Sequence, residues 1–268
     1  MLKITIFTPT YNRAYTLNRL YTSLINQHDL DDFEWIIVDD GSSDNSKELI
    51  ESFIIENKIE IHYFFQSNKG KQQAINLGVQ QAKGDLFFIV DSDDYLKANA
   101  LELVTKEWAT IKSNNHFAGL CLRKMNFSSN EMIGNPLPTR ILDSNSLEIL
   151  YYHNITGDKA EIFRTSILTK NTFPVFKGEK FVPEGLIWNR IAEKYQLRFV
   201  DEGIYMCEYL NDGYSKNFMQ NLKSNPRGFR VYYSNLLKYK IVPFNVKVKA
   251  LIRIIQTLIF QSINNIQK

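Results

Sequence analysis

Leu86-Phe87-Phe88-Ile89-Val90-Asp91-Ser92-Asp93-Asp94 joins five uncharged, apolar residues directly to three carboxylates. An apolar run of this length, rich in aromatic and β-branched residues, predicts a strand that is buried on both faces of a parallel sheet. In open α/β sheets, ligands bind at the carboxyl ends of the strands. The stretch therefore predicts a buried strand that ends at a binding site.

Asp91 and Asp93 are the candidate ligands of that site. They are two residues apart, so in extended backbone their side chains point the same way. Hard carboxylate oxygens suit Mg²⁺ or Mn²⁺, and these ions in turn bind phosphates. We expect a metal–diphosphate site here. The alternative is a solvated acidic turn that caps the next helix, because Asp is common in both places.

The first 95 residues alternate segments typical of strands and of helices. We expect strands at 4–7, 34–38, 60–65 and 86–90, with helices at 14–27, 44–56 and 71–82. This alternation predicts an α/β fold with a mostly parallel sheet, right-handed crossovers and helices on both faces.

The pattern is less regular after residue 96. We expect helices at 98–112, 144–152 and 184–195, strands at 117–124, 198–200 and 204–209, and a polar loop at 127–139. Residues 246–263 have the spacing of a basic amphipathic helix, with apolar residues on one face and polar ones on the other.

Composition is that of a soluble globular protein, with 44% hydrophobic and 23% charged residues in 268. The two cysteines do not form a disulfide framework, and the N-terminus lacks the features of a signal peptide. No apolar run reaches the roughly 18 residues that indicate a membrane span. We therefore expect a cytoplasmic protein.

Charge is distributed unevenly along the chain. The first 212 residues carry 22 Lys and Arg against 29 Asp and Glu, a formal charge of −7. Residues 213–268 carry ten Lys and Arg and no acidic residue. The tail predicts an anionic partner, and an anionic membrane is favoured over nucleic acid because no recognition motif accompanies the charge. The alternative is a helix that packs on the core and leaves its cations in solvent.

Polar segments also follow the first three expected strands. Tyr11 could stack on a base and Arg13 could bind a phosphate, while Asp39 or Asp40 could accept a hydrogen bond from a base or ribose. Residues 68–71 loosely resemble a phosphate-binding loop. Each segment alone is also typical of an ordinary turn. Because all of them lie at the same edge of the predicted sheet, they favour a nucleoside diphosphate site with a divalent cation.

Four segments, in this order, resemble the motifs of family 2 glycosyltransferases. They are Phe7-Thr8-Pro9-Thr10-Tyr11-Asn12-Arg13, Val38-Asp39-Asp40-Gly41-Ser42-Ser43-Asp44, Ala82-Lys83-Gly84-Asp85 and Asp91-Ser92-Asp93-Asp94, with residues 68–76 between the second and third. The resemblance implies a GT-A fold, in which a Rossmann-like sheet is flanked by helices. It also implies a nucleotide-sugar donor, expected to be a UDP-sugar, and inversion at the anomeric carbon.

The resemblance also implies roles for individual residues. Asp91 and Asp93 would form the Asp-x-Asp element that binds Mn²⁺ or Mg²⁺, with Asp93 the more direct ligand. The expected nucleotide-binding residues are Thr8, Pro9, Tyr11, Arg13, Asp39, Asp40, Asn68, Lys71, Asp91 and Ser92.

In the second half, residues 157–161, 178–184 and 188–190 resemble a subgroup of enzymes that make bacterial cell-surface polysaccharides. This implies a carboxylate base, for which Glu184 is the first candidate and Asp158 the rival. The alternative for Glu184 is an acidic residue in the first turn of a helix, where the dipole favours it. The acceptor would be a glycan or a polyprenyl-lipid-linked sugar at the inner face of the cell membrane.

Three regions are expected from this reading. Residues 1–95 would form the nucleotide-sugar-binding half of the GT-A domain, 96–212 its acceptor-binding half, and 213–268 a basic helical extension. Two other functions compete: a nucleotidyltransferase that makes nucleotide sugars, and a non-catalytic nucleotide-sugar-binding subunit. The first would normally show a Gly-rich basic loop after its first strand, and Thr8 to Arg13 do not form one. The donor sugar, the linkage and the oligomeric state are not indicated by the sequence.

Overall fold

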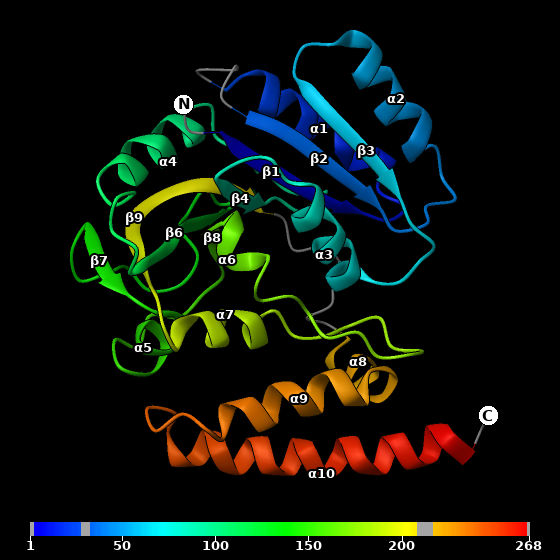
Figure 1. Ribbon diagram of the computed structural model, residues 1–268, viewed down its shortest axis with the longest axis vertical. Coiled ribbons are helices and arrows are strands. Elements are labelled where there is room, and N and C mark those ends of the chain that lie inside the picture. Colours follow the sequence, from blue (N-terminus) through cyan, green and yellow to red (C-terminus); the bar gives the residue numbers. More distant parts are fainter. Residues whose placement is uncertain (1–2, 28–32, 208–216, 267–268) are drawn as a thin grey trace.

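The protein was analysed as a computed structural model that describes residues 3–27, 33–207 and 217–266. Nine strands within these residues form one sheet, in the order β3-β2-β1-β4-β8-β6-β9-β5, and β7 pairs with β9 outside this path (Figure 1). The strands are β1 Ile4–Thr10, β2 Phe33–Asp39, β3 Glu60–Phe65, β4 Leu86–Ile89, β5 Tyr95–Leu96, β6 Phe117–Asn126, β7 Ile141–Ser144, β8 Lys159–Arg164 and β9 Gln196–Cys207.

The first four strands are mutually parallel, as the sequence predicts. β1 pairs in parallel with β2 on one side and with β4 on the other, and β2 pairs in parallel with β3. The chain thus builds outward from β1 to β3 and then returns to the opposite side of β1. This reversal makes a topological switch point at the carboxyl ends of β1 and β4, which is where ligands bind in such sheets.

The second half of the sheet was predicted less well. β8 was not predicted, yet it lies between β4 and β6 and is antiparallel to both. The strands expected at 198–200 and 204–209 form one continuous strand, β9, which pairs in parallel with β6 through register shifts. The expected end of the second strand, at 209, lies outside the described residues. The short strands β5 and β7 were also not predicted.

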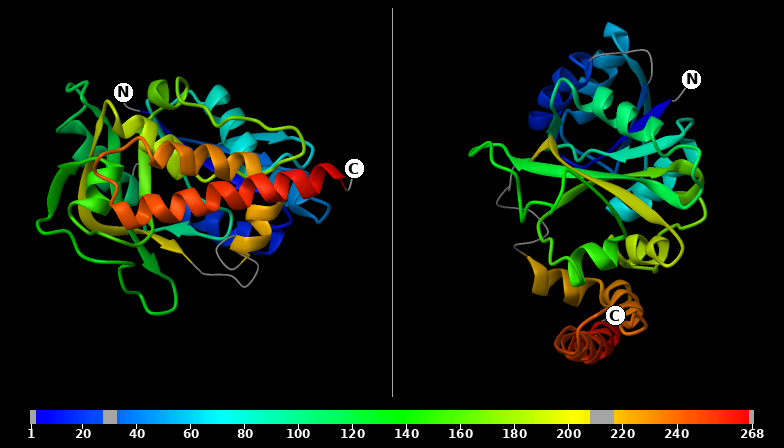
Figure 2. Two further views of the ribbon diagram at one scale, coloured as in Figure 1. Left: turned by 90° about the horizontal axis from the view of Figure 1, so that it is seen from below. Right: turned by 90° about the vertical axis from the view of Figure 1, so that its left-hand side faces the viewer.

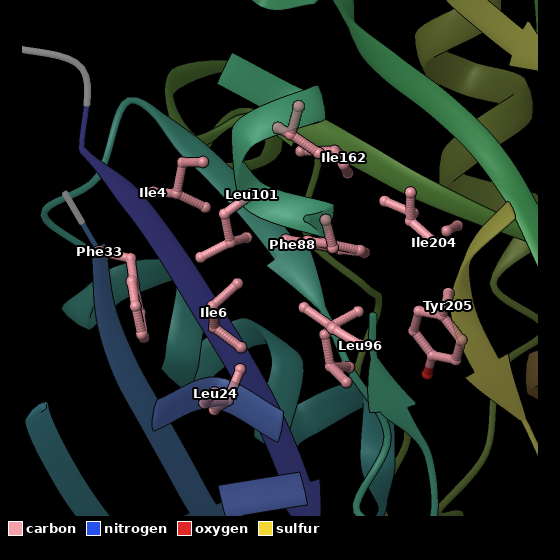
Figure 3. Close-up of a cluster of buried hydrophobic side chains, with 14 of the residues drawn as sticks. Ile4, Ile6, Leu24, Phe33, Phe88, Leu96, Leu101, Ile162, Ile204 and Tyr205 are labelled. Carbon is pink, nitrogen blue, oxygen red and sulfur yellow. The ribbon is translucent and has the colours of Figure 1, made fainter. Parts of the chain in front are cut away.

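Helices cover both faces of the sheet. Side chains of α1, α2 and α4 pack on one face, and side chains of α3, α5 and α7 pack on the other. Figure 3 shows part of the first core, where Ile6 of β1 lies next to Leu24 of α1, and Phe88 and Tyr205 from two other strands belong to the same cluster. The helices are α1 Ala14–Ile25, α2 Ser46–Glu56, α3 Lys71–Gln81, α4 Ala100–Ala109, α5 Ser146–Tyr151, α6 Thr165–Leu168, α7 Gly185–Ala192, α8 Phe218–Ser224, α9 Pro226–Leu236 and α10 Phe244–Ile266.

The C-terminal helices α8, α9 and α10 form a further layer beyond α7 (Figures 1 and 2). α9 lies between α7 and α10, so α10 is the outermost helix and does not reach the sheet. Among the residues described, no helix is both long enough and apolar enough to cross a membrane.

A stack of three aromatic rings fixes α1 and α2 on the sheet. The ring of Tyr21 lies 4.0 Å from that of Phe53 and 6.2 Å from that of Trp35, measured between centroids. Trp35 is fully buried, and its indole N–H donates to Thr8 Oγ1 at 2.9 Å. The stack therefore joins two helices to β1 and β2 next to the carboxyl end of β1.

We predict that Trp35→Ala lowers the free energy of unfolding by about 3–5 kcal/mol, because it opens a large cavity and leaves the Thr8 hydroxyl without its donor. Urea unfolding followed by circular dichroism would measure this. Ile55→Ala, on the exposed side of α2, is the control and should change stability by less than about 0.5 kcal/mol. Equal effects of the two substitutions would contradict the prediction.

Candidate active site

The candidate site lies at the switch point between β1 and β4. The loop after β1 presents Tyr11, whose side chain is 46% exposed, and Arg13, the N-cap residue of α1. The segment after β4 presents Asp91 and Asp93. Burial and the negative charge of Asp91 raise the pKa of Asp93, while the positive charge of Arg13 opposes this rise. These two loops therefore face one another across the site.

Asp39, at the end of β2, is buried and shapes the loop that follows it. Its Oδ1 accepts a hydrogen bond from the backbone N–H of Ser42 at 2.7 Å, and its Oδ2 accepts one from the Tyr63 hydroxyl at 3.1 Å. The same loop is joined to the loop after β1, because the N–H of Asn12 donates to Ser42 Oγ at 2.9 Å.

Asp40 fixes the loop before α3. Its Oδ1 accepts from Gln66 Nε2 and from the N–H of Lys69, both at 2.6 Å, and its Oδ2 accepts from the N–H of Gly70 at 2.7 Å. One carboxylate thus holds three donors of the segment that leads into α3. The next residue along the chain, Lys71, is the first residue of that helix.

Gly70 also brings this loop against the segment at 177–184. Its φ is +95°, a conformation that disfavours residues with a side chain, and a Cβ atom there would lie 1.8 Å from the carbonyl oxygen of Lys180. Only glycine allows the loops at 66–70 and 177–184 to approach so closely. Their contact positions Lys71 beside Glu184.

Lys71 joins two of the other residues predicted from sequence. Its ammonium nitrogen lies 2.7 Å from Asp91 Oδ1 and 3.0 Å from Glu184 Oε1. Burial alone would lower the pKa of Lys71, but the charges of the two carboxylates raise it well above its usual value. The ammonium therefore stays charged and holds together a carboxylate that follows β4 and one at the start of α7.

β9 and β6 supply further site residues that sequence reasoning missed. The backbone N–H of Asp91 donates to the Tyr205 hydroxyl at 2.9 Å, and Lys124 Nζ lies 4.0 Å from the centre of the Tyr205 ring. Lys124 is also 3.9 Å from Asp94 Oδ2. Burial raises the pKa of Asp94 to about 7, although the charge of Lys124 opposes the rise. The sequence signal for Lys124 was a pair of cations, Arg123 and Lys124, that follows an apolar stretch in the same strand.

Glu161 of β8 is the other missed residue. Burial raises its pKa to about 7, the charge of Lys124 lowers it, and the charge of Glu184 raises it. Glu161 therefore lies near both residues. A strand pattern of alternating charged and apolar residues was the available signal, since Lys159 and Glu161 lie on one side of β8.

Asp158, the rival candidate for the base, lies in the exposed loop before β8. The pKa of Cys207, at the end of β9, is raised to about 12 by burial and then by the charges of Asp94 and Asp158. Asp158 therefore lies at the same end of the sheet as Asp94 and the candidate site. Glu184, in contrast, contacts Lys71 directly.

The remaining predicted residues are mostly enclosed. Thr8 is fully buried and its hydroxyl accepts from Trp35, while Pro9 and Ser92 are buried. Asn68 is half-buried, and its backbone lies against Gly41 where the loops after β2 and β3 meet. The structure thus places Tyr11 and Arg13 at the surface of the site and these four residues in its frame.

The C-terminal helices hold the segment that carries Glu184. The side-chain Oδ1 of Asn225 accepts from the N–H groups of Lys180 and Phe181 at 2.7 and 3.0 Å. The Glu179 carboxylate accepts from the backbone N–H groups of Arg227 and Gly228, at the start of α9, at 3.0 and 2.9 Å. A carboxylate is favoured at a helix N-terminus. The segment 177–184 is therefore anchored on both sides, to the loop before α3 and to α9.

Asp91 and Asp93 have the donor chemistry that a divalent cation requires. Both offer hard carboxylate oxygens, and the mutual repulsion that raises the pKa of Asp93 would be relieved by a cation. A different group of potential ligands, Glu34, Glu60 and His62, lies at the amino ends of β2 and β3, the opposite edge of the sheet.

Comparison with known proteins places the chain among glycosyltransferases. The sequence profile described as glycosyl transferase family 2 matches residues 5–147. The GalNAc(5)-diNAcBac-PP-undecaprenol beta-1,3-glucosyltransferase of Campylobacter jejuni is 30% identical over 202 residues, which cover 72% of this chain and 61% of that protein. The chain thus spans less than two thirds of this relative, and it matches 43% of the chain in a crystal structure of TarS from Staphylococcus aureus.

Solved structures share the fold. TarS 1–349 in complex with UDP-GlcNAc matches 96% of this chain and 72% of its own, with a TM-score of 0.67 at 20% identity. The mannosyltransferase PcManGT of Pyrobaculum calidifontis, in complex with GDP-Man and Mn²⁺, matches 100% of this chain and 76% of its own, with a TM-score of 0.62 at 14% identity. The expected GT-A fold, with its C-terminal helical extension, is confirmed.

We predict that Glu161 makes stability depend on pH. Its pKa is about 7 in the folded protein against 4.5 ordinarily, so between these values the unfolded chain loses a proton that the folded chain keeps. The free energy of unfolding should therefore fall as pH rises through this window. Glu161→Gln should remove part of the fall, on the order of 1–3 kcal/mol, when urea unfolding is compared at the two ends of the window.

Glu131→Gln, in an exposed loop, is the control and should keep the wild-type pH dependence. If Glu161→Gln keeps it as well, the carboxyl group does not titrate as the structure indicates.

Proposed function

Because the chain belongs to glycosyl transferase family 2, we propose that it inverts the anomeric carbon of a sugar that it moves from a nucleoside diphosphate to a hydroxyl group. The acceptor is a glycan or a lipid-linked sugar of bacterial surface polysaccharide synthesis. The observation that carries the proposal is the contact of Lys71 with both Asp91 and Glu184, because it unites a donor-side and an acceptor-side carboxylate.

Donor binding is assigned to the loops at the switch point. Tyr11 offers an exposed ring for stacking on the base, and Arg13 offers a cation for a phosphate. Asp39 and Asp40 fix the loops around this space. Both oxygens of Asp39 and Oδ2 of Asp40 can each accept a further hydrogen bond from the base or ribose, whereas Oδ1 of Asp40 already accepts two. UDP is the favoured nucleotide, supported by the UDP-GlcNAc bound to TarS, while GDP-Man in PcManGT supports GDP as the alternative.

Asp93 and Asp91 would hold Mn²⁺ or Mg²⁺, and the Mn²⁺ of PcManGT supports this assignment. When bound, the ion would neutralise the charge that develops on the leaving diphosphate. Lys71, at 2.7 Å, orients the carboxylate of Asp91, while the Tyr205 hydroxyl fixes its backbone.

Glu184 is proposed as the base. An alcohol is a weak nucleophile, so a carboxylate must remove its proton as it attacks the anomeric carbon. Attack occurs on the face opposite the leaving diphosphate, and this single displacement inverts the configuration. The segment that carries Glu184 is anchored by Asn225 and Glu179, which keeps the carboxylate at a fixed place relative to the donor loops.

The acceptor class follows from the names of two relatives. The Campylobacter jejuni enzyme is named for an undecaprenol-linked acceptor, and TarS for poly(ribitol-phosphate). A lipid-linked acceptor would place the reaction at the inner face of the cell membrane, and the ten cations of residues 213–268 support a peripheral contact with anionic lipid. Family membership argues against the nucleotidyltransferase and the non-catalytic subunit.

We predict that Glu184→Gln lowers the rate of sugar transfer by about 10²–10⁴-fold, because the amide cannot accept the proton. UDP binding should be retained, since the amide oxygen can still accept from Lys71. Transfer to an extract of lipid-linked acceptors, with each candidate UDP-sugar, would measure the rate.

The transfer rates of Asp158→Asn, which changes the rival base, and of Glu131→Gln, the control, are measured together with that of Glu184→Gln. Wild-type transfer by Glu184→Gln together with loss of transfer in Asp158→Asn would make Asp158 the base.

We predict that one nucleotide among UDP, GDP and dTDP binds tightly in isothermal titration, and only with Mn²⁺ or Mg²⁺ present. Asp93→Ala should abolish the metal-dependent part of binding, because it removes the more direct ligand. Asp85→Ala is the matched control, since Asp85 is exposed just before the opposite end of the same strand, β4. Absence of binding by all three nucleotides would contradict the proposed donor site.

A further inference from the structure

The outermost helix, α10, presents an apolar surface to solvent. Its exposed residues, 38–83% accessible, are Phe244, Val248, Leu251, Ile252, Ile255, Leu258, Ile259 and Ile263. We call this set the outer face of α10. The spacing of these residues places them on one side of the helix along almost its whole length. A contiguous apolar surface of this kind marks an interaction site.

The polar side of α10 faces the protein instead. Thr257 is fully buried, Gln261 accepts from Arg230 at 2.6 Å, and Asn264 donates to the carbonyl oxygen of Lys223 at 2.9 Å. The helix is therefore amphipathic in the opposite sense to an ordinary surface helix. The alternative drawn from sequence is a helix that packs on the core and leaves its cations in solvent; α10 packs on α9 and leaves its outer face, as well as Lys249, exposed.

Cations surround one end of the outer face. Lys238 and Lys240, in the turn between α9 and α10, are exposed, as is Lys249, and Lys247 lies on the other flank of the helix. Residues 213–268 contain no acidic residue that could neutralise these cations. The partner of this surface must therefore combine an apolar interior with negative charge.

An anionic lipid bilayer has both properties. A second copy of the chain would cover the apolar residues, but it would bring another extension that carries ten cations and no carboxylate. A bilayer offers acyl chains to the outer face and anionic phosphate headgroups to the flanking lysines.

We propose that the outer face of α10 docks on an anionic bilayer with the helix axis parallel to the surface. The apolar side chains enter the boundary between headgroups and acyl chains, and the lysines near the α9–α10 turn contact the headgroups. Docking needs only α10 and the turn before it. The use of this docking to present a lipid-linked acceptor rests on the proposed function.

The test uses the full chain and vesicles that mix phosphatidylglycerol with phosphatidylcholine, or contain phosphatidylcholine alone. Wild-type protein should cosediment with the anionic vesicles. Ile255→Gln/Ile259→Gln should reduce the partition coefficient by at least about tenfold, because two apolar side chains no longer enter the bilayer. The matched control is Ile54→Gln/Ile55→Gln, an exposed pair on α2 far from α10, which should bind like wild type.

Equal binding by both variants, or no binding by wild type, would overturn the proposal. So would a wild-type dimer that becomes a monomer in Ile255→Gln/Ile259→Gln, measured by light scattering, because a second copy would then cover the face. Thermal unfolding of the same variants reports whether they fold, and UDP titration reports the donor site separately from vesicle binding. Unchanged UDP binding together with lost vesicle binding supports docking, whereas failure of UDP to bind wild type would count against the proposed donor site and leave docking intact.

Discussion

The site depends on the two ion pairs that the ammonium group of Lys71 forms with Asp91 and Glu184. This ammonium group lies within 3.0 Å of carboxylates that come from β4 and from the start of α7, which would otherwise repel one another. Much of the surrounding structure serves to place it. Asp40 fixes the loop before α3, and Gly70 lets that loop lie against Lys180. The hydrogen bond from the N–H of Gly70 to Asp40, and the lack of a side chain at Gly70, therefore determine the position of the Lys71 ammonium group.

The same cluster carries more negative than positive groups. Lys71 and Lys124, with Arg13 at the edge, oppose five carboxyl groups: Asp91, Asp93, Asp94, Glu161 and Glu184. The cost appears in the pKa values, which are raised for Asp93, Asp94 and Glu161 by burial and by neighbouring carboxylates. A divalent cation would relieve the repulsion among these carboxyl groups. Its positive charge would in turn stabilise a bound diphosphate.

The first half of the fold could be read from sequence because its signals are local. β1 to β4 are short segments rich in apolar residues, each followed within a few residues by polar turn or loop residues, and their order along the chain determines a parallel sheet. β8 could not be read in this way, because Lys159 and Glu161 alternate with apolar residues and imitate a solvent-exposed strand, whereas Glu161 lies near Lys124 and Glu184. Asp201 to Gly203 likewise imitate a turn within β9. Lys124 and Tyr205 join the site only through pairing of β6 with β9, which no local pattern encodes.

The anchoring of residues 177–184 by Asn225 and Glu179 has a geometric consequence. These contacts make the segment that carries Glu184 part of the same rigid unit as α9, against which α10 packs. If α10 rests on a bilayer, the carboxylate is held at a constant height above the lipid surface. The protein would then select acceptors by the distance of their free hydroxyl group from the membrane. A glycan one sugar too short or too long would present no hydroxyl group at the height of the Glu184 carboxylate.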